Sequence, residues 1–295
     1  MNAERHAYLI MCHNHFEQLM MMLAALDDER NDFYIHVDKK SISCPKSKIQ
    51  STVQKGTCVF VDSIEVNWGA YSQINCELIL LKAAIQKQHA YYHLLSGVDF
   101  PIKSQREIHN FFEKNSGKEF LELCKDDQRK DFLYRVCLYH FFQERIGNEK
   151  GQDFGTRQWC KWEHRLLKIQ KWLHVDRLKK QHDIFYKGAN WFSITHGLAT
   201  YVISQEKLIK KIFRWSNCGD ESFVQLVAMQ SPYKDNIISD HMRMIDWERG
   251  TPYIFRKEDY EHIKSSPYMF ARKFDDQVDR EIIEMLYHDC MENSE

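Results

Sequence analysis

Residues 7–37 read AYLIMCHNHFEQLMMMLAALDDERNDFYIHV and place a helical pattern between two short, mostly apolar runs. The runs Ala7–Met11 and Phe33–Val37 are typical of strands that are buried on both faces of a sheet. Between them, apolar residues recur every three or four positions, at Phe16, Leu19, Met20, Leu23 and Leu26. A buried strand, an amphipathic helix and a second buried strand predict a βαβ unit with parallel strands.

The same alternation continues along the chain. Further strands are expected at Cys58–Val61, Tyr91–Leu95, Asn190–Ile194 and Arg243–Trp247. Further helices are expected around Ile74–Ile85, at Lys257–Ile263 and at Val278–Tyr287, and the middle from Asp126 to Lys180 is helical and highly charged. These patterns predict an α/β protein of one domain, with a helical middle insertion.

Polar residues follow three of the expected strands directly. They are Cys12–Asn14 (CHN), Asp38–Lys40 (DKK) and Ser96–Asp99 (SGVD). Because ligands of such sheets bind beyond the carboxyl ends of the strands, we expect these segments to lie together at a binding site.

The overall composition excludes some classes of function. The chain has 295 residues, with 41 Lys plus Arg against 42 Asp plus Glu, so its formal net charge is −1. A protein that grips nucleic acid usually has a marked basic excess, and none is present. The most apolar stretch, Leu19–Leu26, is too short to span a bilayer, and the nine cysteines contain no CxxC pair, which favours reduced thiols.

Several binding motifs are missing from the sequence. It contains no GxGxxG, no P-loop and no D-x-D, which disfavours a glycine loop that cradles phosphates. His13 and His15 have no third metal ligand near them in the sequence, so a polar loop beside the sheet edge is the preferred interpretation.

Four segments together resemble one enzyme family. They are FYIHVDKK (Phe33–Lys40), LLSGVDFPIK (Leu94–Lys103), CGDESFVQL (Cys218–Leu226) and MFARKFD (Met269–Asp275), the last preceded by Arg243 and Asp246–Trp247. In this order they are similar to the inverting glycosyltransferases that include the core-2 and I-branching β-1,6-N-acetylglucosaminyltransferases and the peptide O-xylosyltransferases. The resemblance covers about 6–286.

The resemblance implies a GT-A fold, which is a Rossmann-type mixed sheet flanked by helices. It implies a nucleotide-sugar-binding half (1–125), a charged helical segment (126–182) and an acceptor-binding and catalytic half (183–295). It also implies a UDP-sugar donor and no metal or other cofactor. The absence of D-x-D supports the last point, because most GT-A enzymes hold the donor diphosphate through a metal on that motif.

The acidic pair Asp220–Glu221 carries the expected chemistry. By family match Glu221 is the catalytic base, since a sugar hydroxyl is a weak acid that needs a carboxylate within hydrogen-bond reach. Asp220 is interpreted as a helix cap or orienting residue on the acceptor side. The alternative is that both residues only favour a helix N-terminus electrostatically.

The donor is expected to be held by residues from both halves. The resemblance places Arg243, Lys273 and the adjoining Arg272 at the diphosphate, where cations replace a metal by charge-assisted hydrogen bonds. It places Asp38 and Lys39 or Lys40 near the nucleotide, Trp68 against the uracil or pocket wall, and Asp99 under the donor sugar. Trp191 is expected on the acceptor side. Turn, core and helix-flanking surface roles remain the alternatives for these residues.

One feature is not explained by the family motifs. Residues 156–180 contain eight basic and two acidic side chains, while Trp159, Trp162, Leu166, Ile169 and Leu173 recur at helical spacing. This pattern predicts a basic amphipathic helix, either packed on the domain with a solvated basic face or docked on an anionic inner membrane.

The sequence therefore predicts a metal-independent inverting glycosyltransferase. The expected reaction moves a sugar, N-acetylglucosamine in the first instance, from a UDP donor to a hydroxyl of an oligosaccharide or lipid-linked glycan. The alternatives are a β-xylosyltransferase of the same family and a non-catalytic UDP-sugar or glycan-binding module. Animal members have an N-terminal membrane anchor that is not seen here, so a bacterial cytoplasmic enzyme, peripheral at the inner membrane face, is expected; a chain trimmed of its anchor is the alternative.

Overall fold

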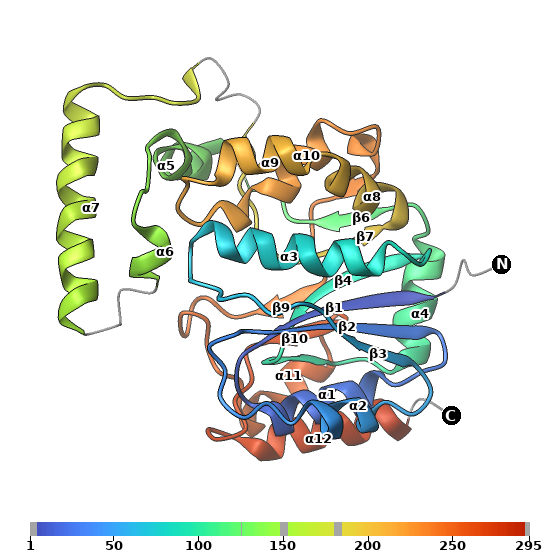
Figure 1. Ribbon diagram of the computed structural model, residues 1–295. Coiled ribbons are helices and arrows are strands. Elements are labelled where there is room, and N and C mark those ends of the chain that lie inside the picture. Colours follow the sequence, from blue (N-terminus) through green and yellow to red (C-terminus); the bar gives the residue numbers. More distant parts are fainter. Residues whose placement is uncertain (1–4, 125, 148–152, 180–184, 293–295) are drawn as a thin grey trace.

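The architecture is taken from a computed structural model that describes residues 5–124, 126–147, 153–179 and 185–292. In this part of the chain, seven strands form one large sheet in the order β3-β2-β1-β4-β7-β6-β8 (Figure 1). The strands are β1 (His6–Cys12), β2 (Asn31–Val37), β3 (Thr57–Phe60), β4 (Tyr91–Ser96), β6 (Glu119–Leu121), β7 (Phe192–Thr195) and β8 (Ile237–Ile238).

The direction of the strands divides this sheet into two parts. Strands β3, β2, β1 and β4 are parallel to one another, as the βαβ pattern predicts. Strand β7 runs antiparallel to both β4 and β6, and β8 is parallel to β6. The predicted α/β fold with a mixed sheet flanked by helices is confirmed.

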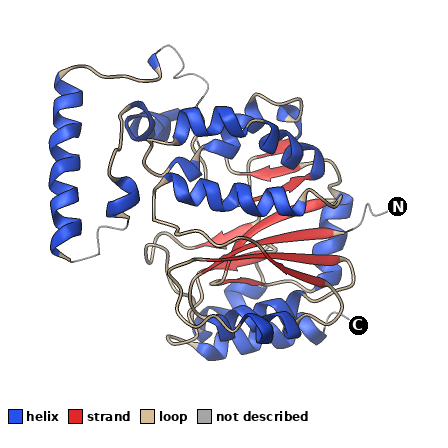
Figure 2. Cartoon of the chain, viewed as in Figure 1, coloured by secondary structure: helices blue, strands red, loops and turns tan. Residues whose placement is uncertain are grey.

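The two faces of the sheet are covered by different helices (Figure 2). Along β1, Tyr8 and Ile10 enter one core while Ala7 and Leu9 enter the other, because successive side chains of a strand point to opposite faces. The first core includes side chains of α1 (Phe16–Leu26), α2 (Lys46–Thr52), α4 (Gln105–Lys114), α11 (Tyr260–Lys264) and α12 (Arg280–Glu292). The second core includes side chains of α3 (Tyr71–Ala84), α5 (Asp126–Cys137), α8 (His196–Ser204), α9 (Glu206–Phe213) and α10 (Phe223–Met229).

A second, smaller sheet joins distant parts of the sequence. It consists of β5 (Asp99–Pro101), β10 (Phe270–Arg272) and β9 (Arg243–Ile245), in that order. Strand β10 is antiparallel to β5 and parallel to β9, and this register sets Arg272 opposite Asp99. Two segments that are 173 residues apart in the sequence are thereby brought to one edge of the cavity described below.

The charged middle of the chain is helical, as predicted. It forms α5, α6 (Gln143–Ile146) and α7 (Phe154–Trp172). Helix α7 lies at the edge of the molecule, at the left of Figure 1, and packs against α6. None of the described helices is long and apolar enough to cross a membrane.

Candidate active site

A large cavity of about 1240 Å³ opens where the parallel strands end. The three polar segments that follow β1, β2 and β4 contribute Cys12, His13, Asp38, Lys40 and Ser96 to its wall. The prediction that these segments share one edge of the sheet is therefore confirmed.

The second half of the chain forms the opposite wall of this cavity. Lining residues from that half include Lys187, Trp191, Asp220, Glu221, Trp247 and Arg272. Most of the side chains that the sequence singled out thus meet in one space, although they come from segments far apart along the chain.

Glu221 lies at the end of a 3₁₀ turn, Gly219–Glu221, and about a third of its side chain is exposed to the cavity. Its Oε2 is 3.4 Å from Arg135 Nη1 and 4.0 Å from Lys187 Nζ. Burial raises the pKa of Glu221, and the two cations oppose this rise. A carboxylate that is partly open to a cavity and flanked by two cations can accept a proton from a bound hydroxyl.

Asp220 has a different environment from its neighbour. Its side chain is buried, Oδ2 accepts a hydrogen bond of 3.2 Å from Gln73 Nε2, and Oδ1 has no hydrogen-bond partner among the described residues. Burial, with a smaller contribution from Glu221, raises the pKa of Asp220 to about 7. Helix α10 begins only at Phe223 and is not capped by Asp220, so the helix-cap interpretation is wrong.

Arg272 is a cation of the cavity wall that other side chains hold in place. Its Nη1 donates a hydrogen bond of 2.7 Å to Asp99 Oδ1 and another to Ser96 Oγ. Its guanidinium also lies over the ring of Trp191, 4.7 Å from the ring centroid. A charge fixed on three sides, with part of its surface in the cavity, is suited to bind an anionic group.

The structure gives Asp99 a supporting position. Asp99 is fully buried, and its carboxylate accepts hydrogen bonds from the backbone N–H and Oγ of Ser96 as well as from Arg272. It does not line the cavity, so the expected contact with a donor sugar is replaced by a role in holding Arg272. Trp191 is also largely buried, and its ring supports the same guanidinium.

Asp38 and Lys40 form a tight turn at the end of β2. Asp38 Oδ1 accepts a 2.8 Å hydrogen bond from the backbone N–H of Lys40, and the Lys40 ammonium donates to Asn67 Oδ1 at 2.9 Å. Both side chains face the cavity, as does Trp68, whose side chain is about half exposed. The structure thus brings Asp38, Lys40 and Trp68 to one wall, and their contact with a nucleotide stays a prediction.

Arg243 is not part of this cavity. Its side chain is 2% exposed, and its guanidinium donates to Ser193 Oγ (2.8 Å) and to the carbonyls of Leu94 (3.1 Å), Phe192 (2.7 Å) and His241. Burial lowers the pKa of Arg243 to about 9. A buried guanidinium whose two terminal nitrogens donate four hydrogen bonds inside the fold is not placed to contact a diphosphate bound in this cavity.

Lys273 follows Arg272 directly but does not belong to the residues that line the large cavity. Its charge contributes to a lowered pKa of His13, a change caused mainly by burial of that imidazole. Lys273 therefore lies near one wall residue, and a role at the diphosphate stays a prediction.

Three charged wall residues were missed by the sequence reasoning: Glu122, Arg135 and Lys187. Glu122 accepts a 2.9 Å hydrogen bond from the backbone N–H of Ala189, and Arg135 and Lys187 flank Glu221. Arg135 comes from α5, inside the segment interpreted as an insertion, so no motif connected it with the acidic pair. Only the fold brings these residues together.

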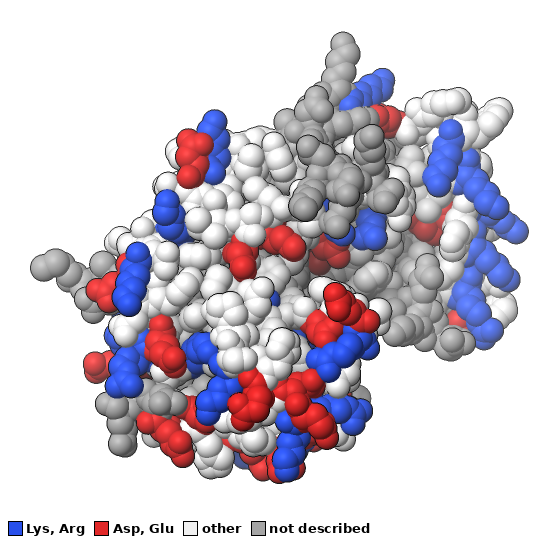
Figure 3. All heavy atoms as spheres, turned by 180° about the vertical axis from the view of Figure 1, so that it is seen from behind, with Lys and Arg blue, Asp and Glu red and all other residues white. Residues whose placement is uncertain are grey.

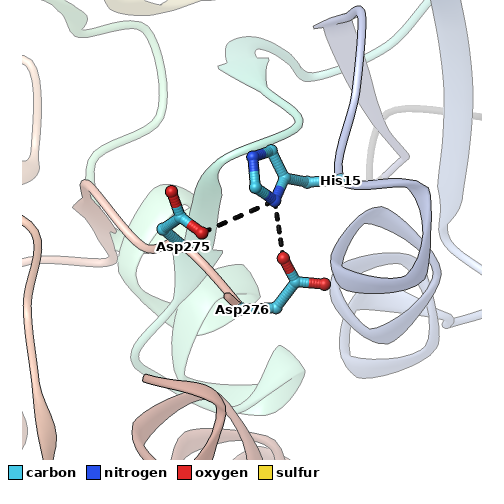
Figure 4. Close-up of side chains that lie close together, drawn as sticks. All are labelled: His15, Asp275 and Asp276. Atoms are coloured by element: carbon cyan, nitrogen blue, oxygen red, sulfur yellow. Dashed lines mark hydrogen bonds and ion pairs between the residues drawn. The ribbon is translucent and has the colours of Figure 1, made fainter. Parts of the chain in front are cut away.

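His15 is the centre of a small acidic cluster outside the large cavity (Figure 4). Its Nδ1 is 2.5 Å from Asp276 Oδ1 and 3.7 Å from Asp275 Oδ1. The carboxylates come from the segment after β10, which explains why no third ligand was visible near His13 and His15 in the sequence. The direct contact between the imidazole and Asp276 connects the start of α1 to the C-terminal part of the chain.

Comparison with known proteins assigns a family to this chain. Residues 6–266 match the family model described as "Branch: Core-2/I-Branching enzyme". The chain belongs to the Core-2/I-branching enzyme family, so the predicted resemblance is confirmed.

The curated relatives that match are xylosyltransferases. Xylosyltransferase 2 of Rattus norvegicus is 24% identical over 322 residues, covering 96% of this chain and 33% of the relative. Xylosyltransferase 1 of Mus musculus is 23% identical over 312 residues, covering 97% of this chain and 30% of the relative. The chain thus spans about a third of the length of these relatives.

Among solved structures, the apo form of mouse xyloside xylosyltransferase 1 is similar to this chain, with a TM-score of 0.39 and 12% sequence identity. That match covers 90% of this chain and 96% of the other.

Proposed function

We propose that this chain transfers a sugar from a UDP-sugar to a hydroxyl of a glycan, with inversion at the anomeric carbon. The observation that carries the proposal is the shared wall of one cavity, where the partly exposed carboxylate of Glu221 and the fixed guanidinium of Arg272 both lie. Membership in the Core-2/I-branching family supports the same reaction class.

In the proposed reaction, Glu221 accepts the proton of the acceptor hydroxyl as its oxygen attacks the anomeric carbon. The bond between that carbon and the UDP oxygen breaks, and UDP leaves with the electron pair. Arg272, with Lys273 as a further candidate, offsets the charge that develops on the diphosphate. Arg135 and Lys187 keep the Glu221 carboxylate oriented and favour its ionised form.

Nucleotide binding is proposed for the wall formed by Asp38, Lys40 and Trp68. The Asp38 carboxylate at a strand end can accept a ribose or uracil hydrogen bond, and the exposed Trp68 ring offers a stacking surface. Asp220 and Trp191 are largely buried, so we propose that they support the acceptor side by positioning their neighbours.

Metal independence is also part of the proposal. The sequence has no D-x-D motif, and the cavity wall contains cations, among them Arg272, that can offset the charge of a diphosphate. N-acetylglucosamine and xylose are the two candidate donor sugars: the family model names branching enzymes, whereas the matching relatives are named xylosyltransferases.

A thermal-shift panel tests donor binding. UDP, UDP-N-acetylglucosamine, UDP-xylose and GDP-mannose are each added with and without EDTA. We expect the uridine compounds to raise the melting temperature equally in both conditions, and GDP-mannose to leave it unchanged. Stabilisation that disappears with EDTA would overturn the metal-free mechanism. Donor binding without product formation on any glycan acceptor would favour the non-catalytic module instead.

A further inference from the structure

Helix α7 has its polar and apolar sides reversed with respect to the rest of the molecule. Its buried residues are Glu163 and Gln170. Glu163 contacts His140 Nδ1 at 3.1 Å and accepts a hydrogen bond from the backbone of Phe142. Gln170 forms two hydrogen bonds with the backbone of Tyr139, of 2.8 and 2.9 Å. The contact with the protein is therefore centred on polar groups.

The large apolar side chains of this helix point away from the protein. Trp162 and Ile169 are about half exposed, and Phe154, Trp172 and Leu173 are 58–76% exposed. Trp159, Leu166 and Leu167 are the exceptions, because they are partly buried, and the Trp159 ring packs on Phe142 with centroids 4.9 Å apart. A surface helix of a globular protein normally turns its apolar side to the core. Here the apolar side is left for another surface to cover.

The same outer surface is basic. Helix α7 contains five cations, all exposed: Arg157, Lys161, Arg165, Lys168 and Lys171. The acidic residue of the helix, Glu163, is on the buried side, and among the described residues no carboxylate is paired with these five cations. Figure 3 shows Lys and Arg side chains along this edge of the molecule, at the right of the view.

Exposed tryptophans beside unpaired cations match an anionic lipid surface. The apolar rings enter the region between headgroups and acyl chains, and the long Lys and Arg side chains reach the lipid phosphates. A second copy of the chain fits less well, since a two-fold contact through this face would set like charges against each other. The net charge of the whole chain, −1, does not oppose this local attraction, because the cations are concentrated on one edge.

We propose that the outer face of α7, formed by Phe154, Trp162, Ile169, Trp172, Leu173 and the five cations, docks on a membrane with anionic headgroups. Helix α7 packs on α6, and Ile146 at the end of α6 lines the large cavity. Docking therefore holds the cavity beside the lipid surface. This contact does not depend on which reaction the cavity performs.

Co-sedimentation with sucrose-loaded vesicles tests this proposal. Vesicles of phosphatidylcholine alone are compared with vesicles that also contain phosphatidylglycerol, using the full chain. We expect binding to the anionic vesicles only. The variant Lys161→Glu/Lys168→Glu should bind at least about thirtyfold more weakly, because each basic residue near such a surface contributes about 1 kcal/mol. The variant Trp162→Ser/Trp172→Ser should lose the part of the binding that resists high salt.

Lys114→Glu/Lys118→Glu is the matched control. It makes the same change of charge at and just after the end of α4, on the opposite side of the molecule (Figure 1), and should bind like the wild type. Circular dichroism and thermal unfolding verify that each variant is folded. Equal vesicle binding by the α7 variants and the control would overturn the proposal, as would no binding of the wild type. A dimer without lipid that dissociates in the Trp162→Ser/Trp172→Ser variant would assign the face to self-association instead.

Discussion

At the scale of single residues, Glu221 and Arg272 are held in different ways. Arg272 is fixed by Asp99, by Ser96 and by the ring of Trp191, which leaves its charge little freedom to move. The contacts of Glu221 with Arg135 and Lys187 are longer, 3.4 and 4.0 Å. A preorganised cation suits charge stabilisation, and a loosely paired carboxylate can still reach a substrate proton.

Replacement of Arg272 tests its role at the diphosphate. Arg272→Ala should lower kcat by about 10²-fold, the effect of removing one preorganised donor to a developing charge. Arg272→Lys should restore only part of this loss, because an ammonium cannot reproduce the planar contacts with Asp99 and Trp191. Steady-state kinetics with a UDP-sugar provides the measurement, and near-normal turnover of Arg272→Ala would remove this residue from the mechanism.

Lys273 is the matched comparison for Arg272. If it contributes to the same charge stabilisation, Lys273→Ala should also lose on the order of 10²-fold in kcat. If Lys273 does not reach the diphosphate because it lies outside the cavity wall, Lys273→Ala should lower kcat by no more than a few-fold. The two alanine variants measured side by side decide which cation meets the diphosphate.

Asp220 should make the free energy of unfolding depend on pH. Burial raises its pKa from an ordinary value of 3.8 to about 7 in the folded protein. Between these pH values the folded state holds a proton that the unfolded state has released, so this group lowers stability as the pH rises from about 4 to 7. Asp220→Asn should remove this contribution, on the order of a few kcal/mol.

The test compares urea unfolding of the wild type and Asp220→Asn at pH 4 and at pH 8. The variant should be the more stable protein at pH 8. The difference should shrink at pH 4, close to the ordinary pKa of 3.8, where the folded-state carboxyl is protonated and part of the unfolded-state carboxyl is protonated as well. A difference that is the same at both pH values would contradict the raised pKa.

At the scale of secondary-structure elements, Arg243 connects strands of both sheets. It starts β9 and donates to the carbonyl of Leu94 on β4 and to groups of Phe192 and Ser193 on β7. The family motif suggested that Arg243 is a site residue. In the structure its guanidinium instead connects the smaller sheet to strands β4 and β7 of the large sheet by hydrogen bonds. A periodicity or a motif cannot distinguish these two uses, because both need an Arg at the same position.

Arg243→Met should therefore destabilise the fold without weakening donor binding. The substitution leaves buried oxygen acceptors without their donor, which should lower the free energy of unfolding by about 3 kcal/mol. Urea denaturation measures the loss, and titration with UDP measures binding by the molecules that remain folded. If the Arg243→Met protein is as stable as the wild type but no longer binds UDP, Arg243 contacts the donor and the structural role is wrong.

The long strands at the start of the chain could be predicted from the sequence, whereas three of the shortest strands could not. The runs that became β1 and β2 are long enough to show a pattern of burial, and they were predicted with nearly correct bounds. Strands β5, β8 and β10 have only two or three residues, too few for any periodicity. The pairing of β5 with β10 places Asp99 against Arg272, so this part of the site was also invisible in the sequence.

At the scale of the whole molecule, the sequence located the site edge but not all of its charges. Asp38, Trp68, Glu221 and Arg272 were predicted from the family resemblance, and the structure brings them to the wall of one cavity. Arg135 and Lys187 come from separate parts of the chain. Their role depends on contact with Glu221, and only the tertiary fold brings the three side chains together.

The orientation of α7 is also a property of the whole molecule. The sequence predicted an amphipathic helix with Trp159 and Trp162 on one apolar side. The structure separates them, with Trp159 against Phe142 and Trp162 exposed. Which side of a helix faces the protein depends on the surface against which it packs, here the polar backbone of the Tyr139–Phe142 segment. The helical spacing of apolar residues in the sequence does not show what that surface is.

The measurement that tests the central claim most directly is sugar transfer by Glu221→Gln. Product formation from a UDP-sugar and a glycan acceptor is followed in the presence of EDTA, and UDP binding is titrated for the same protein. Glu113→Gln, an exposed carboxylate on α4, is the matched control. The account predicts that Glu221→Gln binds UDP normally and loses about 10²- to 10⁴-fold in turnover, while the wild type and the control remain active with EDTA. Normal turnover by Glu221→Gln, or a wild type that EDTA inactivates, would contradict it.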